Sequence, residues 1–172
     1  MTQYASSEAG QESDSSLGPP RRVLLVDDDI RMREVLDDAL QGWSFATSLA
    51  GTFREAREVV LAEPPFAVIV SDYHLPDGNG LEFHDWLRRE LLLAVPFLLI
   101  SGGMLRTPSP ADDYEFLAKP FRLQQFRDRV ETLSRAPQPA VRAFNLTIAQ
   151  EALASVYARS KPRPDARPGG RG

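Results

Sequence analysis

The sequence predicts an α/β domain with a doubly wound, five-stranded parallel sheet over residues 21–135. Short runs of consecutive apolar residues, typical of strands buried on both faces, alternate with longer segments whose apolar residues recur at helical spacing. Strands joined in this alternation pair in parallel, with the helices as crossover connections on both faces of the sheet. A chain of 172 residues with 42% hydrophobic residues can bury one core of this size. We therefore expect one folded domain with a tail at each end.

Five apolar runs supply the predicted strands. One of them, AVIVSD, ends at Asp72 and is followed by a cluster of Pro, Asp, Gly and Asn, which is typical of a turn. The second run begins at Trp43 and continues to Ala50. The predicted strands cover residues 23–26, 43–50, 67–72, 95–100 and 114–118.

Four helices are predicted, over residues 30–40, from Thr52 to the Pro64-Pro65 pair, over about 81–92, and over 123–133. Thr52 followed by Glu55 indicates a capping box, and Gly42 is suited to end the first helix. Between the fourth and fifth strands we expect a shortened or irregular fourth helix, because helix-breaking residues interrupt the segment. These residues are Gly102, Gly103, Pro108 and Pro110.

Both tails differ in composition from the predicted domain. Residues 1–20 are rich in Ser, Glu, Gln and Gly, and we expect them to be disordered. Residues 136–172 are Pro- and Arg-rich, with an amphipathic helix predicted at about 145–158 that either docks a partner or second copy, or packs back on the domain. No apolar run is long enough to span a membrane and no signal peptide is recognisable, so we expect a cytoplasmic protein.

Polar residues follow four of the five predicted strands. Asp27, Asp28 and Asp29 follow the first strand, Asp72 ends the third, and Ser101 and Lys119 follow the fourth and fifth. Singly, an Asp at a strand end is more often a helix cap or turn former, and a Lys before Pro is more often a surface residue. The carboxyl ends of parallel strands meet at one edge of the sheet, where open α/β proteins bind ligands. The whole set therefore favours a functional site.

The chemistry that uses this set of residues is phosphoryl transfer to a carboxylate. Clustered acids bind a hard divalent cation such as Mg²⁺ (or Mn²⁺), which allows Asp72 to act as the nucleophile. Lys119 and Ser101 can donate hydrogen bonds to phosphate oxygens. The chain has no cysteine and only two histidines, His74 and His84, so thiolate chemistry is excluded and a zinc site is not expected.

Four segments of the sequence resemble the receiver domain of two-component response regulators. They are VLLVDDD at 23–29, VIVSDYHLPDGNGLEF at 68–83, LLISGG at 98–103 and FLAKPF at 116–121. The resemblance implies a flavodoxin-like sheet with strand order 2-1-3-4-5. It also implies a role for each matching residue. Asp72 is the phosphoacceptor and a metal ligand, Asp28 binds Mg²⁺ directly, Asp27 binds it through water, and the backbone carbonyl of His74 completes the metal site. Ser101 and Lys119 bind phosphate, Ser101 and Phe116 are the switch residues, and the Lys119-Pro120 peptide bond is cis.

The resemblance implies a phosphoacceptor rather than an enzyme with its own substrate, one that assists its own phosphotransfer and autodephosphorylation. The implied phosphodonor is a sensor histidine kinase or a histidine phosphotransfer protein, and the output is contact with another protein. A different interpretation is a phosphorylation-independent interaction module that binds through the helix at 145–158. A DNA-binding regulator is a weaker alternative. Residues 135–172 contain seven basic and two acidic residues but no dense Lys/Arg run, so a solvated tail is favoured and nucleic acid is not expected as a partner.

Overall fold

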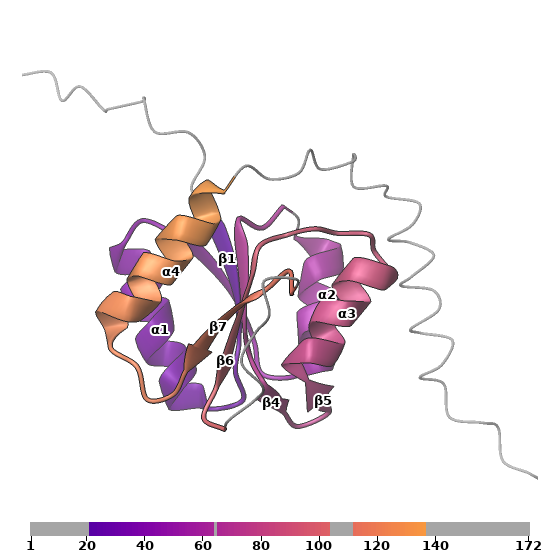
Figure 1. The fold of residues 1–172 in the computed structure, drawn as a ribbon, viewed down its shortest axis with the longest axis horizontal. Helices are drawn as coiled ribbons and strands as arrows, with labels where there is room; N and C mark the ends of the chain where they lie inside the picture. Colours follow the sequence, from indigo (N-terminus) through magenta and orange to yellow (C-terminus); the bar gives the residue numbers. More distant parts are fainter. Residues whose placement is uncertain (1–20, 64, 104–111, 137–172) are drawn as a thin grey trace, which may run out of the picture.

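A computed structural model describes residues 21–63, 65–103 and 112–136 of the chain. Figure 1 shows a central sheet with α1 (Ile30–Gly42) and α4 (Leu123–Arg135) on one face, and α2 (Phe53–Ala62) and α3 (Gly80–Arg89) on the other. Residues 1–20 and 137–172, which include the helix predicted at 145–158, lie outside the described residues. None of the helices within the described ranges is long and apolar enough to cross a membrane.

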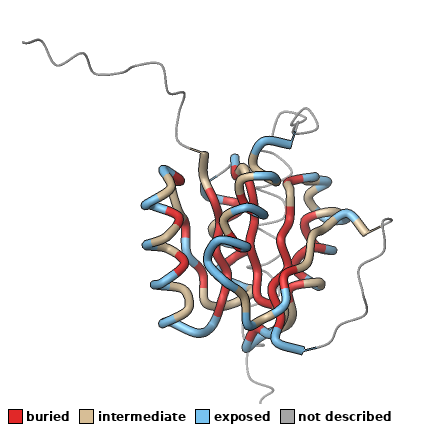
Figure 2. Tube along the Cα trace, turned by 60° about the vertical axis from the view of Figure 1, so that its left-hand side comes forward, coloured by how far each residue is buried: buried red, intermediate tan, exposed pale blue. Residues whose placement is uncertain are grey.

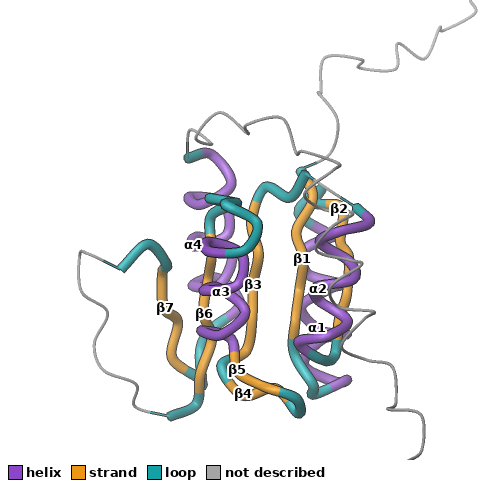
Figure 3. Tube along the Cα trace, turned by 90° about the vertical axis from the view of Figure 1, so that its right-hand side faces the viewer, coloured by secondary structure: helices purple, strands orange, loops and turns teal. Residues whose placement is uncertain are grey.

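The main sheet has five parallel strands in the order β2-β1-β3-β6-β7. Counted along the chain these are the first to fifth strands of the sheet, so the predicted order 2-1-3-4-5 is confirmed. β7 lies at one edge of the sheet (Figure 3). The strands are β1 (Arg22–Val26), β2 (Ala46–Ala50), β3 (Val68–Asp72), β6 (Phe97–Ser101) and β7 (Glu115–Ala118).

A small antiparallel hairpin follows the central strand β3. It consists of β4 (His74–Leu75) and β5 (Gly78–Asn79), paired as His74 with Asn79 and Leu75 with Gly78. In Figure 1 it lies below α2 and α3, and in Figure 3 it lies next to the lower end of β3. The sequence predicted only a turn here, because strands of two residues are too short to produce a periodic pattern.

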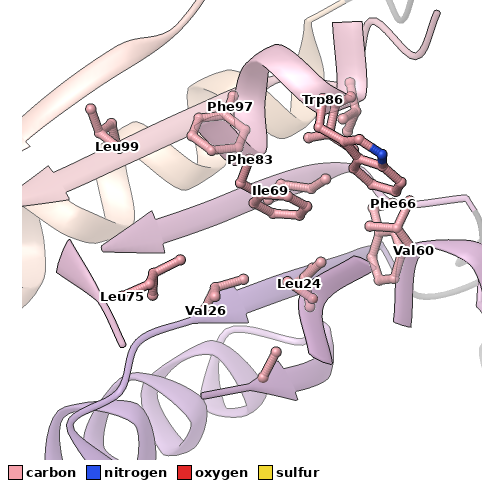
Figure 4. Close-up of a cluster of buried hydrophobic side chains, with 14 of the residues drawn as sticks. Leu24, Val26, Val60, Phe66, Ile69, Leu75, Phe83, Trp86, Phe97 and Leu99 are labelled. Atoms are coloured by element: carbon pink, nitrogen blue, oxygen red, sulfur yellow. The ribbon is translucent and has the colours of Figure 1, made fainter. Parts of the chain in front are cut away.

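The sheet separates two hydrophobic clusters because successive side chains of each strand point to opposite faces. Leu24 and Val26 of β1 lie in the cluster with α2 and α3, and Val23 and Leu25 lie in the cluster with α1 and α4. Figure 4 shows the first cluster, in which Leu75 extends from β4 toward Val26. In Figure 2 the buried residues concentrate in the strands and the exposed residues lie on the outer sides of the helices.

The second strand starts later than predicted. Trp43 is the C-cap of α1 and its N–H donates to the Ala39 carbonyl at 3.1 Å, which extends the helix to Gly42. Ser44 has a φ of 65°, so the chain reverses direction there and β2 begins only at Ala46. The apolar pattern continues through this turn because Phe45 is buried in the core. The burial of this connecting residue explains why the apolar pattern predicts a strand that starts too early.

Helix capping differs in detail from the prediction. Thr52 Oγ1 accepts from the Glu55 N–H at 3.0 Å, but the Glu55 carboxylate accepts from Gly51 N–H at 2.8 Å. The predicted capping box therefore has only one of its two bonds. A complete capping box starts α3, where Asn79 Oδ1 accepts from Glu82 N–H at 2.9 Å and Glu82 Oε2 accepts from Asn79 N–H at 3.1 Å.

Two predicted apolar helix positions do not face the core. Val35 is 52% exposed and Leu123 is 44% exposed, although Leu36, Phe126 and Val130 on the same helices are buried. The apolar stripe of each helix is therefore narrower than the sequence pattern indicated.

Residues 102–103 and 112–114, the two ends of the segment between β6 and β7, form bends rather than helical turns. Residues 104–111, where the irregular fourth helix is predicted, lie outside the described part of the chain.

Candidate functional site

Four strands of the sheet bring the predicted site residues to one edge. Asp27 directly follows β1, Asp72 ends β3, Ser101 ends β6 and Lys119 directly follows β7. The register pairs Asp72 with Ile100 and Ser101 with Ala118, so the three strand ends are level with one another. In Figure 3 this edge is the lower end of the sheet, next to β4 and β5.

Lys119 connects two of the acids. Its Nζ lies 2.9 Å from Asp72 Oδ2 and 3.0 Å from Asp27 Oδ2. Burial by itself would lower the pKa of Lys119, but the hydrogen bonds to Asp72 and Asp27 outweigh it and raise the pKa above the ordinary value. Lys119 therefore stays charged and partly compensates the two carboxylates.

Asp27 is almost fully buried and both of its carboxylate oxygens have partners. Oδ1 accepts from the Asp29 N–H at 2.9 Å, and Oδ2 accepts from Lys119. Burial raises the pKa of Asp27, while the hydrogen bond and charge of Lys119 oppose that rise. The Arg33 side chain donates to the backbone carbonyl of Asp27 and adds a second nearby positive charge.

Asp72 differs from Asp27 in having an unsatisfied oxygen. Its Oδ1 is buried and has no hydrogen-bond partner among the residues that the structure describes. A buried carboxylate oxygen without a partner costs free energy, and proteins usually satisfy such an atom with a donor, a water or an ion. Carboxylate oxygens of Asp27, Asp28 and Asp72 lie within 4.8 Å of one another. Oxygen ligands in this arrangement fit a hard cation such as Mg²⁺.

The third acid of the Asp27–Asp29 run has a structural role. The Asp29 side chain accepts from the N–H groups of Arg31 at 2.9 Å and Met32 at 3.2 Å and is the N-cap of α1. Asp28, in contrast, is exposed and belongs to the acidic cluster. Of the three acids, Asp29 therefore has the ordinary role of an Asp at a strand end, which is to cap the following helix.

Ser101 is fully buried at the end of β6. Its Oγ accepts from the Gly103 N–H at 3.2 Å, and its carbonyl accepts from the Lys119 N–H at 2.7 Å. The second bond fixes the backbone of Lys119 beside β6. The Lys119-Pro120 peptide bond is cis, as the sequence resemblance implied. Phe116 is partly buried and packs against the cluster shared with α2 and α3.

His74 lies in β4, two residues after Asp72, with an exposed side chain. Its imidazole makes an edge contact with Tyr73 at a ring separation of 4.9 Å. The imidazole is therefore a rim group at this edge, and the backbone carbonyl of His74 remains the predicted metal ligand.

Two residues beside Asp72 were not identified as site residues from the sequence. Ser71 is fully buried and its Oγ donates to the Asp72 carbonyl at 2.8 Å. Gly80 approaches the same carbonyl so closely that a Cβ would lie 2.5 Å from it and 2.6 Å from a methyl group of Leu99. The sequence places Gly80 at the end of a turn cluster, which predicts a turn but not the close approach to Asp72.

Comparison with known proteins identifies the domain. Residues 23–131 match the family model of the response regulator receiver domain. The chain belongs to this family. The matched range contains Asp27, Asp28, Asp72, Ser101 and Lys119, so the receiver domain carries the whole candidate site.

The chain is 32% identical over 122 residues to the response regulator protein PilR of Pseudomonas aeruginosa, covering 69% of this chain and 27% of PilR. Among solved structures it is similar to the receiver domain of HemR from Leptospira biflexa, with 29% identity and a TM-score of 0.58, covering 69% of this chain and 98% of that one. The chain is also similar to the crystal structure of a response regulator receiver protein from Sinorhizobium medicae WSM419, with 20% identity and a TM-score of 0.60, covering 68% of this chain and 96% of that one. At this level of identity the similarity supports the fold alone. The chain spans 27–59% of the length of the curated relatives compared.

Proposed function

We propose that this receiver is a phosphoacceptor, which takes a phosphoryl group onto Asp72 from the phosphohistidine of a sensor histidine kinase or a histidine phosphotransfer protein. An Asp72 carboxylate oxygen forms a bond to phosphorus while the P–N bond of the phosphohistidine breaks. The imidazole leaves with the bonding electron pair and takes up a proton. The product is an acyl phosphate on the end of β3.

The observation that carries this proposal is the unequal surroundings of the two Asp72 oxygens. Oδ2 is held by Lys119 at 2.9 Å, whereas Oδ1 is buried without a partner among the described residues. Phosphorylation of Oδ2 leaves Oδ1 for a cation and lets the Lys119 ammonium donate to a phosphate oxygen instead. The Ser101 hydroxyl at the adjacent strand end can donate to another phosphate oxygen.

The residues proposed to hold Mg²⁺ (or Mn²⁺) are Asp28 and Asp72 directly, Asp27 through a water, and the His74 carbonyl. When bound, the cation offsets the repulsion between these carboxylates and the incoming phosphate. Asp27 suits an indirect role, because Lys119 and the Asp29 N–H already occupy its oxygens.

Two exposed apolar residues beside the site suit contact with the phosphodonor protein. Ile30 begins α1 and is 61% exposed, and Leu123 begins α4 and is 44% exposed. Both helices start at the edge of the sheet that carries Asp72. We place this encounter in the cytoplasm, where the catalytic part of a sensor kinase works.

The proposed cycle ends by hydrolysis of the acyl phosphate, so it consumes only the phosphodonor and water. Water attacks phosphorus, inorganic phosphate leaves, and the Asp72 carboxylate is restored. Output in the phosphorylated state is by contact with another protein. The element proposed to transmit the change is β7, which carries Phe116 and ends directly before Lys119.

The test of the proposal is phosphoryl incorporation from a small-molecule phosphoramidate into the full chain. Wild type takes up the label with Mg²⁺ and not with a chelator, and Asp72→Asn abolishes it. Asp37→Asn is the matched control, because Asp37 lies on α1 and accepts hydrogen bonds from Gln41 and Thr47 outside the site. Equal labelling of the Asp72→Asn variant excludes the proposal.

A further inference from the structure

The hairpin of residues 74–79 determines where the His74 carbonyl lies. It begins two residues after Asp72 and has only two cross-strand pairs, His74 with Asn79 and Leu75 with Gly78. A hairpin this short is not stable on its own, so its position depends on contacts with the rest of the domain. Such contacts occur near each end of the hairpin and at its tip.

The two ends of the hairpin are attached to the core and to α3. Leu75 is buried and belongs to the cluster shown in Figure 4, where it lies beside Val26. Asn79 is the N-cap of α3 and shares a complete capping box with Glu82. These contacts fix the side chain of Leu75 and the exit of the hairpin, but they leave its tip free to move.

The tip is attached to a different helix by Asp77. One Asp77 carboxylate oxygen accepts from the Phe53 N–H at 2.7 Å, and the other accepts from the Arg54 N–H at 2.9 Å. These are the first two residues of α2, where backbone N–H groups lack partners within the helix and where the helix dipole favours a negative charge. Both hydrogen bonds are short and are accepted by a carboxylate group, the class of acceptor that forms strong hydrogen bonds with backbone N–H groups.

Gly78, the residue after Asp77, packs closely against the first residue of α2. A Cβ on Gly78 would lie 3.0 Å from the Phe53 ring, so the backbone of the hairpin rests directly on α2. Phe53 in turn packs on Phe83 of α3 at a ring separation of 5.6 Å. The tip of the hairpin is therefore held by hydrogen bonds and by shape against the same helix turn.

We propose that Asp77 is a positioning residue for the metal site: by joining the hairpin to the N-terminus of α2 it holds the His74 carbonyl in place for the cation. This inference rests on the proposed function, because it assumes that the His74 carbonyl binds Mg²⁺. Residues that orient metal ligands without touching the metal commonly change its affinity by about 10–100-fold when they are replaced. Coupling between two sites is reciprocal, so the cation must also stabilise the Asp77 hydrogen bonds at α2.

The test measures Mg²⁺ affinity by titration calorimetry on the full chain. Wild type, Asp77→Ala and Asp77→Asn are compared with the matched control Glu55→Gln. Glu55 is also an acid in the first turn of α2, but its carboxylate accepts from the Gly51 N–H, which lies outside the hairpin. We expect a loss of affinity of about tenfold in Asp77→Ala, a smaller loss in Asp77→Asn, and wild-type affinity in Glu55→Gln. Equal affinities in wild type and both Asp77 variants overturn the inference.

Amide hydrogen exchange adds a readout that a loss of stability alone does not change. In wild type and Glu55→Gln, Mg²⁺ slows exchange of the Phe53 and Arg54 amides. In Asp77→Asn, which keeps one acceptor and so preserves the fold if the alanine variant does not, this slowing is lost for at least one of the two amides. If Mg²⁺ slows exchange of both amides in Asp77→Asn as much as in wild type, the inference is overturned. If wild type does not bind Mg²⁺, the proposed function itself fails. If wild type binds Mg²⁺ and the Asp77 variants bind it equally well, only the role of Asp77 fails.

Discussion

Replacing Lys119 by Met removes the positive charge that lies between two carboxylates. The side chain of Lys119 is 21% exposed, and those of Asp27 and Asp72 are 2% and 11% exposed. A hydrogen bond to a charged group contributes about 1.5–3 kcal/mol, and two are lost here. Part of that loss is offset because Lys119 no longer has to be desolvated, so we expect the free energy of unfolding to fall by about 3 kcal/mol in metal-free buffer. For a domain of this size that corresponds to a decrease in Tm of about 10 °C.

Mg²⁺ is expected to reduce this loss. In wild type the Lys119 ammonium competes with a cation for the carboxylates, and in Lys119→Met it does not. The variant therefore binds Mg²⁺ at least about fivefold tighter, which narrows the difference in stability by about 1 kcal/mol at saturation. Urea unfolding with chelator and with Mg²⁺ measures both quantities.

The control for this experiment is Arg129→Met, which removes a surface ion pair with Glu115 at 2.8 Å. Exposed pairs contribute about 1 kcal/mol or less, and this variant has no reason to respond to Mg²⁺. If Lys119→Met is as stable as Arg129→Met in chelator, or if Mg²⁺ leaves its deficit unchanged, the assignment of Lys119 as the counter-charge of the acids is wrong.

Two further predictions concern individual contacts, and a third concerns the C-terminal tail. Gly80→Ala places a Cβ 2.5 Å from the Asp72 carbonyl, so we expect it to lower the free energy of unfolding by about 1–3 kcal/mol and to slow phosphorylation. The control Gly42→Ala has nothing within 4 Å of the added Cβ and leaves the phosphorylation rate unchanged and the stability unchanged or slightly raised. Chemical denaturation and labelling rates measure these effects, and equal effects at both glycines would contradict the close approach of Gly80. Burial and the nearby Arg88 lower the pKa of His84, against the opposing effect of Asp113. The unfolded chain therefore binds more protons, and the free energy of unfolding falls as the pH drops from 6.5 toward the pKa of folded His84. His84→Gln should flatten this part of the stability–pH curve, and an unchanged slope would contradict the prediction. Deletion of residues 137–172 should leave phosphorylation of the receiver intact, and loss of partner binding irrespective of phosphorylation would instead favour the interaction module.

The sheet was predictable because its signals are local. Fully buried strands such as Val68–Asp72 are continuous apolar runs, and the alternation of strands and helices determines the parallel topology. The meeting of Asp27, Asp72 and Lys119 follows from that topology alone, since all three lie at carboxyl ends of strands. Boundaries were less predictable, as at Trp43 and Phe45, where a helix cap and a buried connecting residue have the composition of a strand.

What the sequence did not reveal are contacts between segments distant in the chain. Asp77 looks like an ordinary turn residue, and its bonds to Phe53 and Arg54 join residues more than 20 positions apart. No sequence pattern assigns a role to His84, but it is buried against Phe97 with its Nε2 2.9 Å from Asp113 Oδ1. Such pairings depend on where the folded helices place their ends, and no periodic pattern encodes them.

The measurement that tests the central claim most directly is mass spectrometric mapping of the phosphorylated residue. The full chain is incubated with a small phosphoramidate and Mg²⁺, and the acyl phosphate is trapped by reduction before digestion. We predict a single modified peptide with the modification on Asp72, and none when a chelator replaces Mg²⁺. Modification of another residue, or the same yield without the cation, would contradict the account.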